Sequence, residues 1–263
     1  MPRDFTIFLW LLKLGALVNL YFLAQALGPA SAATDLRILV PAVILFGVSA
    51  FRCLFPLRYE DEVVFHDTPL SSIFLTRVLA TFSEVAYIYL LSHVIRLLNA
   101  EHVGWVDALS WVMVLQVVVS QGFVWRAILT EQLAFYYYEE LGWAVIMAAN
   151  TIASAYLYAT ANPSGGGQTL LQVNLAFGVL YLPWQCFHLR ALFLDARAGG
   201  EAAQPRAVSG QQLTAGLRRS IEVRNRRTDG ESWGGFVGLT WMVGYWVTLI
   251  PMWVHLIVRV FAG

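Results

Sequence analysis

Seven long apolar stretches dominate this chain, and no other feature constrains its fold as strongly. A helix needs about 20 apolar residues to cross the hydrocarbon core of a bilayer. The stretches that qualify are residues 5–27, 38–55, 72–98, 104–125, 138–159, 169–194 and 233–261. Helix-interrupting pairs such as Gly28-Pro29 and Asn162-Pro163 separate them. We therefore predict an all-α, polytopic transmembrane bundle of about seven spans, with residues 1–263 forming a single transmembrane domain.

The composition agrees with a chain that faces lipid. Of the 263 residues, 58% are hydrophobic and only 13% are charged, whereas soluble domains carry about 25% charged residues. The formal net charge is zero, which gives no reason to expect a nucleic-acid partner. The expected partners are membrane lipids, and the expected location is a bacterial inner membrane or an organelle membrane.

The orientation follows from the connection between the sixth and seventh stretches. Cytoplasmic loops of membrane proteins carry an excess of arginine and lysine. This connection holds Arg197, Arg206, Arg218, Arg219, Arg224, Arg226 and Arg227. We predict that residues 195–232 form a cytoplasmic loop, with the N-terminus also cytoplasmic and the C-terminus external.

An alternative interpretation makes the first stretch a cleaved signal peptide. Arg3 supplies a charged start, and Ala30-Ser31-Ala32 resembles a cleavage site. The apolar run is longer than the 7–15 residues that are usual in a signal peptide. We therefore favour a first transmembrane span over cleavage within residues 1–32.

Two short patterns indicate contact surfaces. Leu213, Leu217 and Ile221 recur at four-residue spacing within the arginine-rich loop, which predicts a short amphipathic helix on an anionic leaflet. Docking of a partner protein is the alternative role. Gly234 and Gly238 form a small-xxx-small pair on the seventh stretch. Such a pair packs helices within a bundle or joins copies in a homodimer or a larger membrane complex.

Charged and polar side chains enter several of the spans. Ionisable residues in hydrocarbon cost several kcal/mol unless they are paired or hydrated, so they are candidates for function. The set is Lys13, Arg77, Glu84, Gln121, Glu139, Glu140, His188 and Arg190, with Trp184 one turn before His188. The predicted orientation places all of them at the midplane or in the cytoplasmic half. We therefore predict one polar cavity that opens toward the cytoplasm.

Arg77 and Glu84 are the most prominent members of this set. Seven residues separate them, so they project from nearly the same face of one helix, about 10 Å apart along its axis. We expect this distance to prevent direct pairing, so that each side chain finds a partner on another helix. Lys13 with Glu84, or Arg77 with Glu139, would then form structural ion pairs that fix the register of the helices.

Motifs for metals and common cofactors are absent from the sequence. No two of the five histidines have the four-residue spacing that places two ligands on one helical face. Cys53 and Cys186 form no CxxC pair. Glu60, Asp61 and Glu62 precede His66 in an acidic segment. It could attract a hard cation, but we favour a solvated loop. We predict no metal site and no cofactor.

Two resemblances add context. The predicted topology resembles that of heliorhodopsins, but residues 233–261 contain no lysine for a retinal Schiff base, which argues against a photoreceptor. Residues 70–85 (LSSIFLTRVLATFSEV) and 120–143 resemble segments of an uncharacterised family of multi-pass membrane proteins. This resemblance includes Arg77, Glu84 and the Glu139–Glu140 pair, and it implies no activity.

The leading hypothesis is a membrane protein that binds or modifies a small amphiphilic or lipid-like molecule. Glu84 or Glu140 would act as acid or base, with His188 assisting proton transfer. The substrate-binding residues would be Arg77, Arg190, Gln121, Lys13, Glu139 and Trp184. The pattern does not decide between an enzyme and a binding protein. The alternatives are a proton- or ion-coupled transporter or channel, and a non-catalytic subunit of a larger membrane complex.

Overall fold

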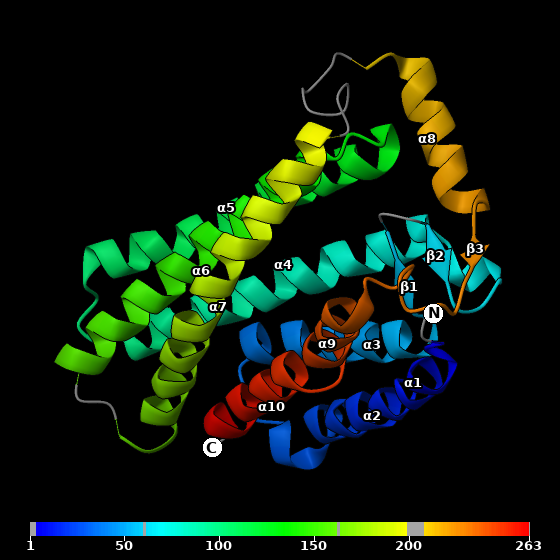
Figure 1. Ribbon diagram of the computed structural model, residues 1–263. Helices are drawn as coiled ribbons and strands as arrows, with labels where there is room; N and C mark the ends of the chain where they lie inside the picture. Colours follow the sequence, from blue (N-terminus) through cyan, green and yellow to red (C-terminus); the bar gives the residue numbers. More distant parts are fainter. Residues whose placement is uncertain (1–3, 60–61, 162–163, 199–207, 263) are drawn as a thin grey trace. The chain divides into compact units, whose positions relative to one another are not determined.

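The computed structural model describes residues 4–59, 62–161, 164–198 and 208–262. Several residues named above lie outside this part of the chain: Arg3, Glu60, Asp61, Asn162, Pro163 and Arg206. The helices are α1 (Thr6–Leu11), α2 (Leu14–Leu27), α3 (Leu36–Leu54), α4 (Ile73–Leu98), α5 (Gly104–Thr130), α6 (Ala134–Thr160), α7 (Gly165–Ala198), α8 (Gly210–Glu222), α9 (Gly235–Trp246) and α10 (Leu249–Phe261) (Figure 1). The 3₁₀ turns η1 (Pro29–Ser31) and η2 (Pro69–Ser71) stand before α3 and α4.

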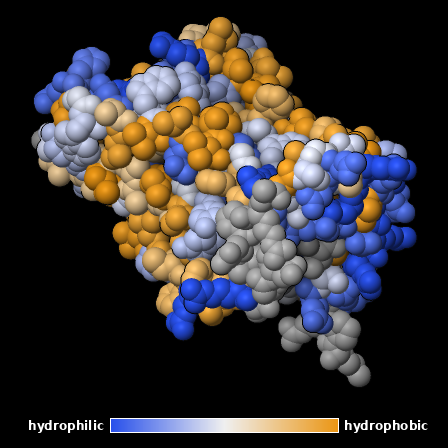
Figure 2. Space-filling view, turned by 90° about the horizontal axis from the view of Figure 1, so that it is seen from above, coloured by the Kyte–Doolittle hydropathy of each residue, from blue (hydrophilic) through white to orange (hydrophobic). Residues whose placement is uncertain are grey.

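Seven helical segments are long and apolar enough to cross a membrane, which confirms the predicted number. They are Thr6–Leu27, Leu36–Leu54, Ile73–Leu98, Gly104–Thr130, Ala134–Thr160, Gly165–Leu194 and Gly238–Phe261. Large apolar side chains such as Leu17, Leu115 and Leu180 are exposed on them. Figure 2 shows hydrophobic side chains over a broad part of one face. Such surfaces suit lipid contact, and together with the seven helices they fit an integral membrane protein.

Two spans are not continuous helices. The first is interrupted at Leu12 and Lys13, between α1 and α2. The seventh breaks between α9 and α10, where Thr248 has a φ of −119° and a ψ of −82°. Pro251 has no N–H to donate to the carbonyl of Val247, so a regular helix cannot run through this point. Hydropathy alone predicts one helix in each case.

The chain folds into two compact units. The first unit comprises Met1–Tyr87 and Leu217–Gly263, and the second comprises Ile88–Gly216. The first unit therefore joins the two ends of the sequence, whereas the second is one continuous stretch.

A small sheet joins distant segments in the first unit. β1 (Leu57–Arg58) pairs antiparallel with β2 (Val63–Val64), and β2 pairs in parallel with β3 (Asn225–Arg226). The sequence does not predict this sheet, because two-residue strands are too short to show alternation.

Hydrogen bonds and ion pairs extend the sheet into what we call the clasp, which joins residues 62–67 to residues 219–228. The Nε atom of Arg219 lies 2.8 Å from a carboxylate oxygen of Glu62, and that of Arg224 lies 2.9 Å from one of Asp67. At the start of the chain, the N–H of Phe5 donates to the carbonyl of Thr228. These contacts hold residues 4–5, 62–67 and 219–229 together on one side of the first unit.

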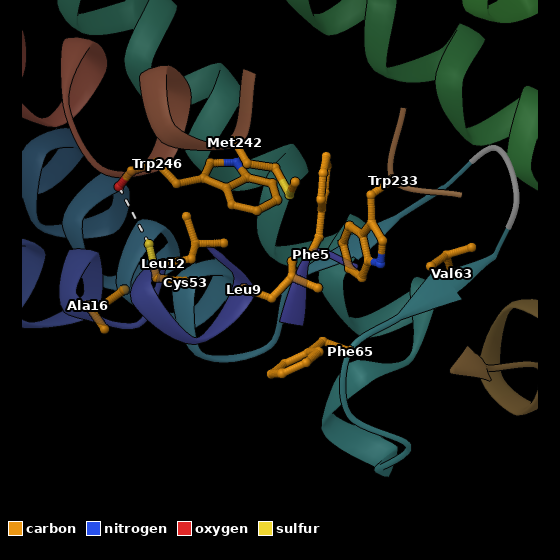
Figure 3. Close-up of a cluster of buried hydrophobic side chains, with 11 residues drawn as sticks. Phe5, Leu9, Leu12, Ala16, Cys53, Val63, Phe65, Trp233, Met242 and Trp246 are labelled. Carbon is orange, nitrogen blue, oxygen red and sulfur yellow. Dashed lines mark hydrogen bonds between the residues drawn. The ribbon is translucent and has the colours of Figure 1, made fainter. Parts of the chain in front are cut away.

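The core of the first unit lies next to the clasp (Figure 3). It is a cluster of buried side chains: Phe5, Leu9, Leu12, Ala16, Ala50, Cys53, Val63, Phe65, Trp233, Met242 and Trp246. The indole N–H of Trp233 donates to the carbonyl of Arg227 at 2.9 Å. The cluster thus ties the start of the first span to the segment that precedes the seventh.

The glycine pair has a role within the chain. Gly234 is the left-handed N-cap of α9, with a φ of 74°, so it precedes the helix and does not lie on the seventh span as predicted. A Cβ atom on Gly238 would clash with the carbonyl of Trp233. Both glycines are therefore required by the local fold, and contact with another chain through them stays a prediction.

The second unit is built on α6, which packs against both α5 and α7. Small residues permit close approach, because a Cβ atom on Gly142 would clash with Ser120 and one on Gly178 would clash with Thr151. The buried Asn174 donates hydrogen bonds to Asn150 and Ser154 across the α6–α7 contact. Interhelical amide bonds of this kind stabilise membrane bundles.

Helix α8 carries the apolar stripe of the arginine-rich segment. Leu213, Leu217 and Ile221 are exposed along it. Gly216, on another side of the helix, approaches the carbonyl of Leu129 at the end of α5 so closely that a Cβ atom would clash. The glycine therefore holds the middle of α8 against the end of α5 while the stripe faces outward.

Candidate functional site

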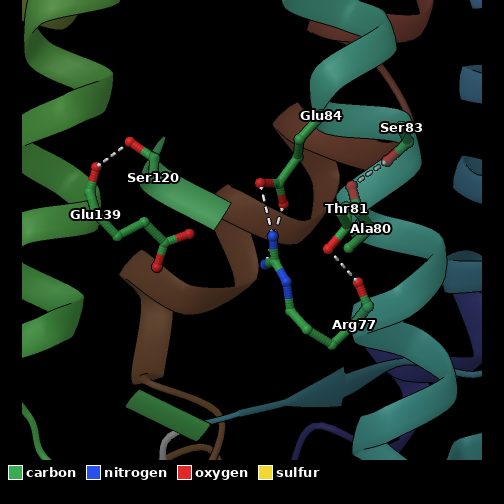
Figure 4. A network of polar contacts seen from close by, with 7 residues as sticks. All are labelled: Arg77, Ala80, Thr81, Ser83, Glu84, Ser120 and Glu139. Carbon is green, nitrogen blue, oxygen red and sulfur yellow. Dashed lines mark hydrogen bonds and ion pairs between the residues drawn. The ribbon is translucent and has the colours of Figure 1, made fainter. Parts of the chain in front are cut away.

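Arg77 and Glu84 pair directly with each other (Figure 4). Both lie on α4, and the two guanidinium nitrogens reach the two carboxylate oxygens at 2.9 and 3.3 Å. The side chains are only 2% and 7% exposed. The expectation that their separation prevents direct pairing was wrong, because the long arginine side chain extends along the helix axis toward the carboxylate. The result is a buried bidentate ion pair.

The surroundings of this pair hold it in place. The hydroxyl of Thr81 donates to the main-chain carbonyl of Arg77 at 2.9 Å. The guanidinium carbon of Arg77 lies 5.7 Å from the ring centre of Tyr59. Because both oxygens of Glu84 are engaged by Arg77, this carboxylate is a poor candidate for a general acid or base. The geometry favours a structural role for the pair.

Lys13 contacts a loop residue. Its ammonium nitrogen lies 2.7 Å from Nε2 of His66 and 4.0 Å from the ring centre of Trp10. His66 belongs to the connection between α3 and α4. Lys13 therefore lies between α1 and α2, beside the loop that connects α3 to α4.

Glu140 and His188 come together in the second unit. Oε1 of Glu140 on α6 lies 3.9 Å from Nε2 of His188 on α7. The imidazole stacks on Trp184, with ring centres 4.9 Å apart and planes at 19°. Glu140 is 24% exposed and His188 is 26% exposed, so this acid–base pair is open to approach. Three predicted site residues thus form one group.

Gln185 completes this group and was missed by the sequence analysis. Its side-chain amide donates to both the main-chain carbonyl and the carboxylate of Glu140, each at 2.8 Å. Its own oxygen is buried and accepts no hydrogen bond from the described residues. Gln185 could have been predicted from its position three residues before His188, because this spacing places both side chains on one face of α7.

The remaining predicted residues are more dispersed. Glu139 and Gln121 are buried, and Arg190 is exposed. Ser120 on α5 lies 3.5 Å from the main-chain carbonyl of Glu139. Glu139 and Glu140 lie in the second turn of α6, which begins at Ala134, four residues before the predicted stretch 138–159. Lys13, Arg77 and Glu84 belong to the first unit and the others to the second, so a single shared cavity stays a prediction.

Comparison with protein-family models, curated proteins and solved structures finds no match to this chain. Within the described residues, no group of three or more His, Cys, Asp or Glu side chains is placed to hold a metal ion. The candidate site therefore rests on the contacts between side chains alone. The best-defined contacts are those among Glu140, Gln185, His188 and Trp184.

Replacement of Glu84 tests the buried ion pair. Glu84→Gln leaves the guanidinium of Arg77 buried without its carboxylate, so we expect a loss of about 3–5 kcal/mol in the free energy of unfolding. Denaturant unfolding of the purified protein in detergent measures it. The control is Glu222→Gln, which breaks the exposed Arg218–Glu222 pair and should cost a few tenths of a kcal/mol. Equal losses in the two variants would show that Arg77 does not depend on Glu84.

The contact between His66 and Lys13 predicts a loss of stability in acid. Burial, then the positive charges of Lys13 and Arg226, hold the pKa of His66 below its usual range. The unfolded chain binds a proton more readily, so stability is full above the unfolded pKa of about 6.5 and falls as the pH drops below it. We expect the Tm to fall more steeply between pH 7 and pH 5 in the wild type than in His66→Gln. The exposed His102→Gln variant should keep the wild-type slope, and parallel profiles for all three proteins would rule out this coupling.

Proposed function

We propose that this integral membrane protein binds a small amphiphilic, lipid-like molecule and transfers a proton to or from it through Glu140 and His188. The observation that carries the proposal is the open carboxylate–imidazole pair on α6 and α7, with its atoms 3.9 Å apart and both side chains about one-quarter exposed. General acid–base catalysis needs such groups within reach of a reacting proton.

Neighbouring side chains orient both partners. Gln185 donates to one oxygen of Glu140 at 2.8 Å, which leaves Oε1 as the oxygen nearer His188. Stacking on Trp184 fixes the plane of the imidazole. Imidazole changes its charge near neutral pH more readily than any other side chain. The pair is therefore arranged to accept and release a proton without large movement.

The surroundings favour an amphiphilic ligand over a water-soluble one. Phe187 and Leu180, on the same helix as His188, are highly exposed on a segment that is apolar enough to span the bilayer. A ligand dissolved in the bilayer can reach such a surface laterally. The exposed Arg190, two residues beyond His188, supplies a positive charge for an anionic headgroup. The expected orientation puts this end of α7 in the cytoplasmic half of the membrane.

Lipid conversion by defined variants tests this function. Wild-type protein in nanodiscs would be incubated with a total membrane lipid extract, and mass spectrometry would identify species that are consumed or formed. We expect Glu140→Gln and His188→Asn to slow the conversion at least about 100-fold, because each removes one proton-transfer partner. The matched control is Glu101→Gln, at an exposed carboxylate of the same unit. No conversion by the wild type, or an unchanged rate in folded Glu140→Gln and His188→Asn, would contradict the proposal.

A second candidate function is proton- or ion-coupled transport, and the break in the seventh span favours it. The side-chain amide of Asn19 donates to the carbonyl of Trp246, the last residue of α9, at 2.7 Å and to that of Gly15 at 2.8 Å. Asn19 is fully buried, and its oxygen has no donor among the described residues. Discontinuous helices with polar partners mark the substrate and ion sites of several transporter folds.

A flux assay separates this candidate from the first. In proteoliposomes with a pH-sensitive dye inside, a transporter should dissipate an imposed pH or sodium gradient faster than protein-free vesicles. Asn19→Leu should reduce that flux, because it removes the amide from the break. Gradients that decay at the protein-free rate under every condition would eliminate transport as the function.

A further inference from the structure

A second buried guanidinium in the first unit has no carboxylate partner among the described residues. Arg52, in the last turn of α3, is 8% exposed. The described residues offer it no hydrogen bond and no ion pair. Its contacts are aromatic, because its guanidinium carbon lies 4.3 Å from the ring centre of Trp246 and 5.4 Å from that of Tyr59.

Arg52 lies close to the buried ion pair. The ring of Tyr59 is 5.4 Å from the guanidinium carbon of Arg52 and 5.7 Å from that of Arg77. Tyr245 on α9 is in electrostatic range of both arginines and of Glu84. Arg77 already bonds both oxygens of the Glu84 carboxylate, and this carboxylate makes no ion pair with Arg52.

The aromatic rings do not satisfy this cation. A guanidinium has five N–H donors in a rigid fork and no acceptor, and ring faces attract its charge without accepting those bonds in the way that oxygen does. The C-terminus of α3 favours a positive charge, but this dipole is weak compared with the cost of burying an ion. The aromatic neighbours of Arg52 thus leave its N–H donors without an oxygen acceptor among the described residues.

The hydroxyl of Tyr87 is a second buried polar group that supports binding of an anion here. No described residue bonds to it. It belongs to the same electrostatic neighbourhood, because Tyr87 and Arg52 both interact with Tyr245. A phosphate or carboxylate would accept hydrogen bonds from the guanidinium and from tyrosine hydroxyls together.

We propose that Arg52 binds the anionic group of a ligand, a phosphate or a carboxylate, with Tyr87 and Tyr245 as the neighbouring hydroxyl donors. The group belongs either to the headgroup of an amphiphile or to a free anion. This binding site shares no residue with Glu140 and His188. It therefore goes beyond the proton-transfer function and stands if that function fails.

Thermal stability with defined probes tests the site. The full-length protein in mild detergent would be titrated with inorganic phosphate, with phosphatidic acid and with phosphatidylcholine, and the Tm would be followed by tryptophan fluorescence. We expect a saturable rise of several degrees with an anionic probe, because a ligand that binds only the folded state raises its stability. Phosphatidylcholine should give less than half of that rise.

Two variants assign the effect to Arg52. Arg52→Gln should abolish the rise, whereas Arg37→Gln should retain it, because Arg37 is an exposed arginine in the first turn of the same helix, paired with Asp35. Arg52→Lys keeps the positive charge but removes the planar guanidinium that can bind an anion with two hydrogen bonds. It should therefore raise the probe concentration at the titration midpoint at least about tenfold. This variant keeps the test decisive if Arg52→Gln does not fold.

The pattern of responses identifies the source of the anion. A rise that depends on Arg52 with phosphatidic acid alone supports a lipid headgroup, and one with inorganic phosphate supports a free anion. The proposal is overturned if neither anionic probe stabilises the wild type. It is also overturned if Arg52→Gln responds like Arg37→Gln, or if Arg52→Lys titrates with the wild-type midpoint.

Discussion

The first unit depends on the clasp, because the clasp joins chain segments that four membrane spans separate in the sequence. Exposed ion pairs are individually weak. Here the parallel pairing of β2 with β3, the bonds from Arg219 and Arg224, and the buried Trp233 act together. Segments joined in this way must lie on the same face of the membrane. An even number of crossings must therefore separate them, in agreement with the four spans between Ile73 and Leu194.

Within the spans, charged side chains meet the low-dielectric interior in three different ways. Arg77 and Glu84 neutralise each other in a closed bidentate pair, which suits a fixed structural element. Glu140 and His188 lie 3.9 Å apart, and each is about one-quarter exposed, which suits the proposed proton transfer. Arg52 has aromatic neighbours but no anion among the described residues. We propose a different role for each arrangement: Arg77 and Glu84 hold the helix, Glu140 and His188 move a proton, and Arg52 binds a negative charge.

The number of spans could be predicted from sequence, because hydropathy is a local property. The direct bond between Arg77 and Glu84 could not, since it depends on how far two side chains extend along one helix. Hydropathy could not predict the break between α9 and α10, although Pro251 indicates an interruption of the helix at this point. Arg52 is the only charged residue within the predicted span 38–55, but its position near the end of that span did not distinguish it from an arginine that reaches the membrane surface.

Membrane sidedness of the connecting segments is the most direct test of the seven-span fold. Single cysteines at Leu70 and Glu231, and at Ala33 and Ala100, would be labelled with an impermeant thiol reagent in a Cys53→Ala, Cys186→Ala background. The account predicts that Leu70→Cys and Glu231→Cys label from one side only, and that Ala33→Cys and Ala100→Cys label from the other side only. Labelling of Leu70→Cys and Glu231→Cys from opposite sides would contradict the clasp and the seven-span fold with it.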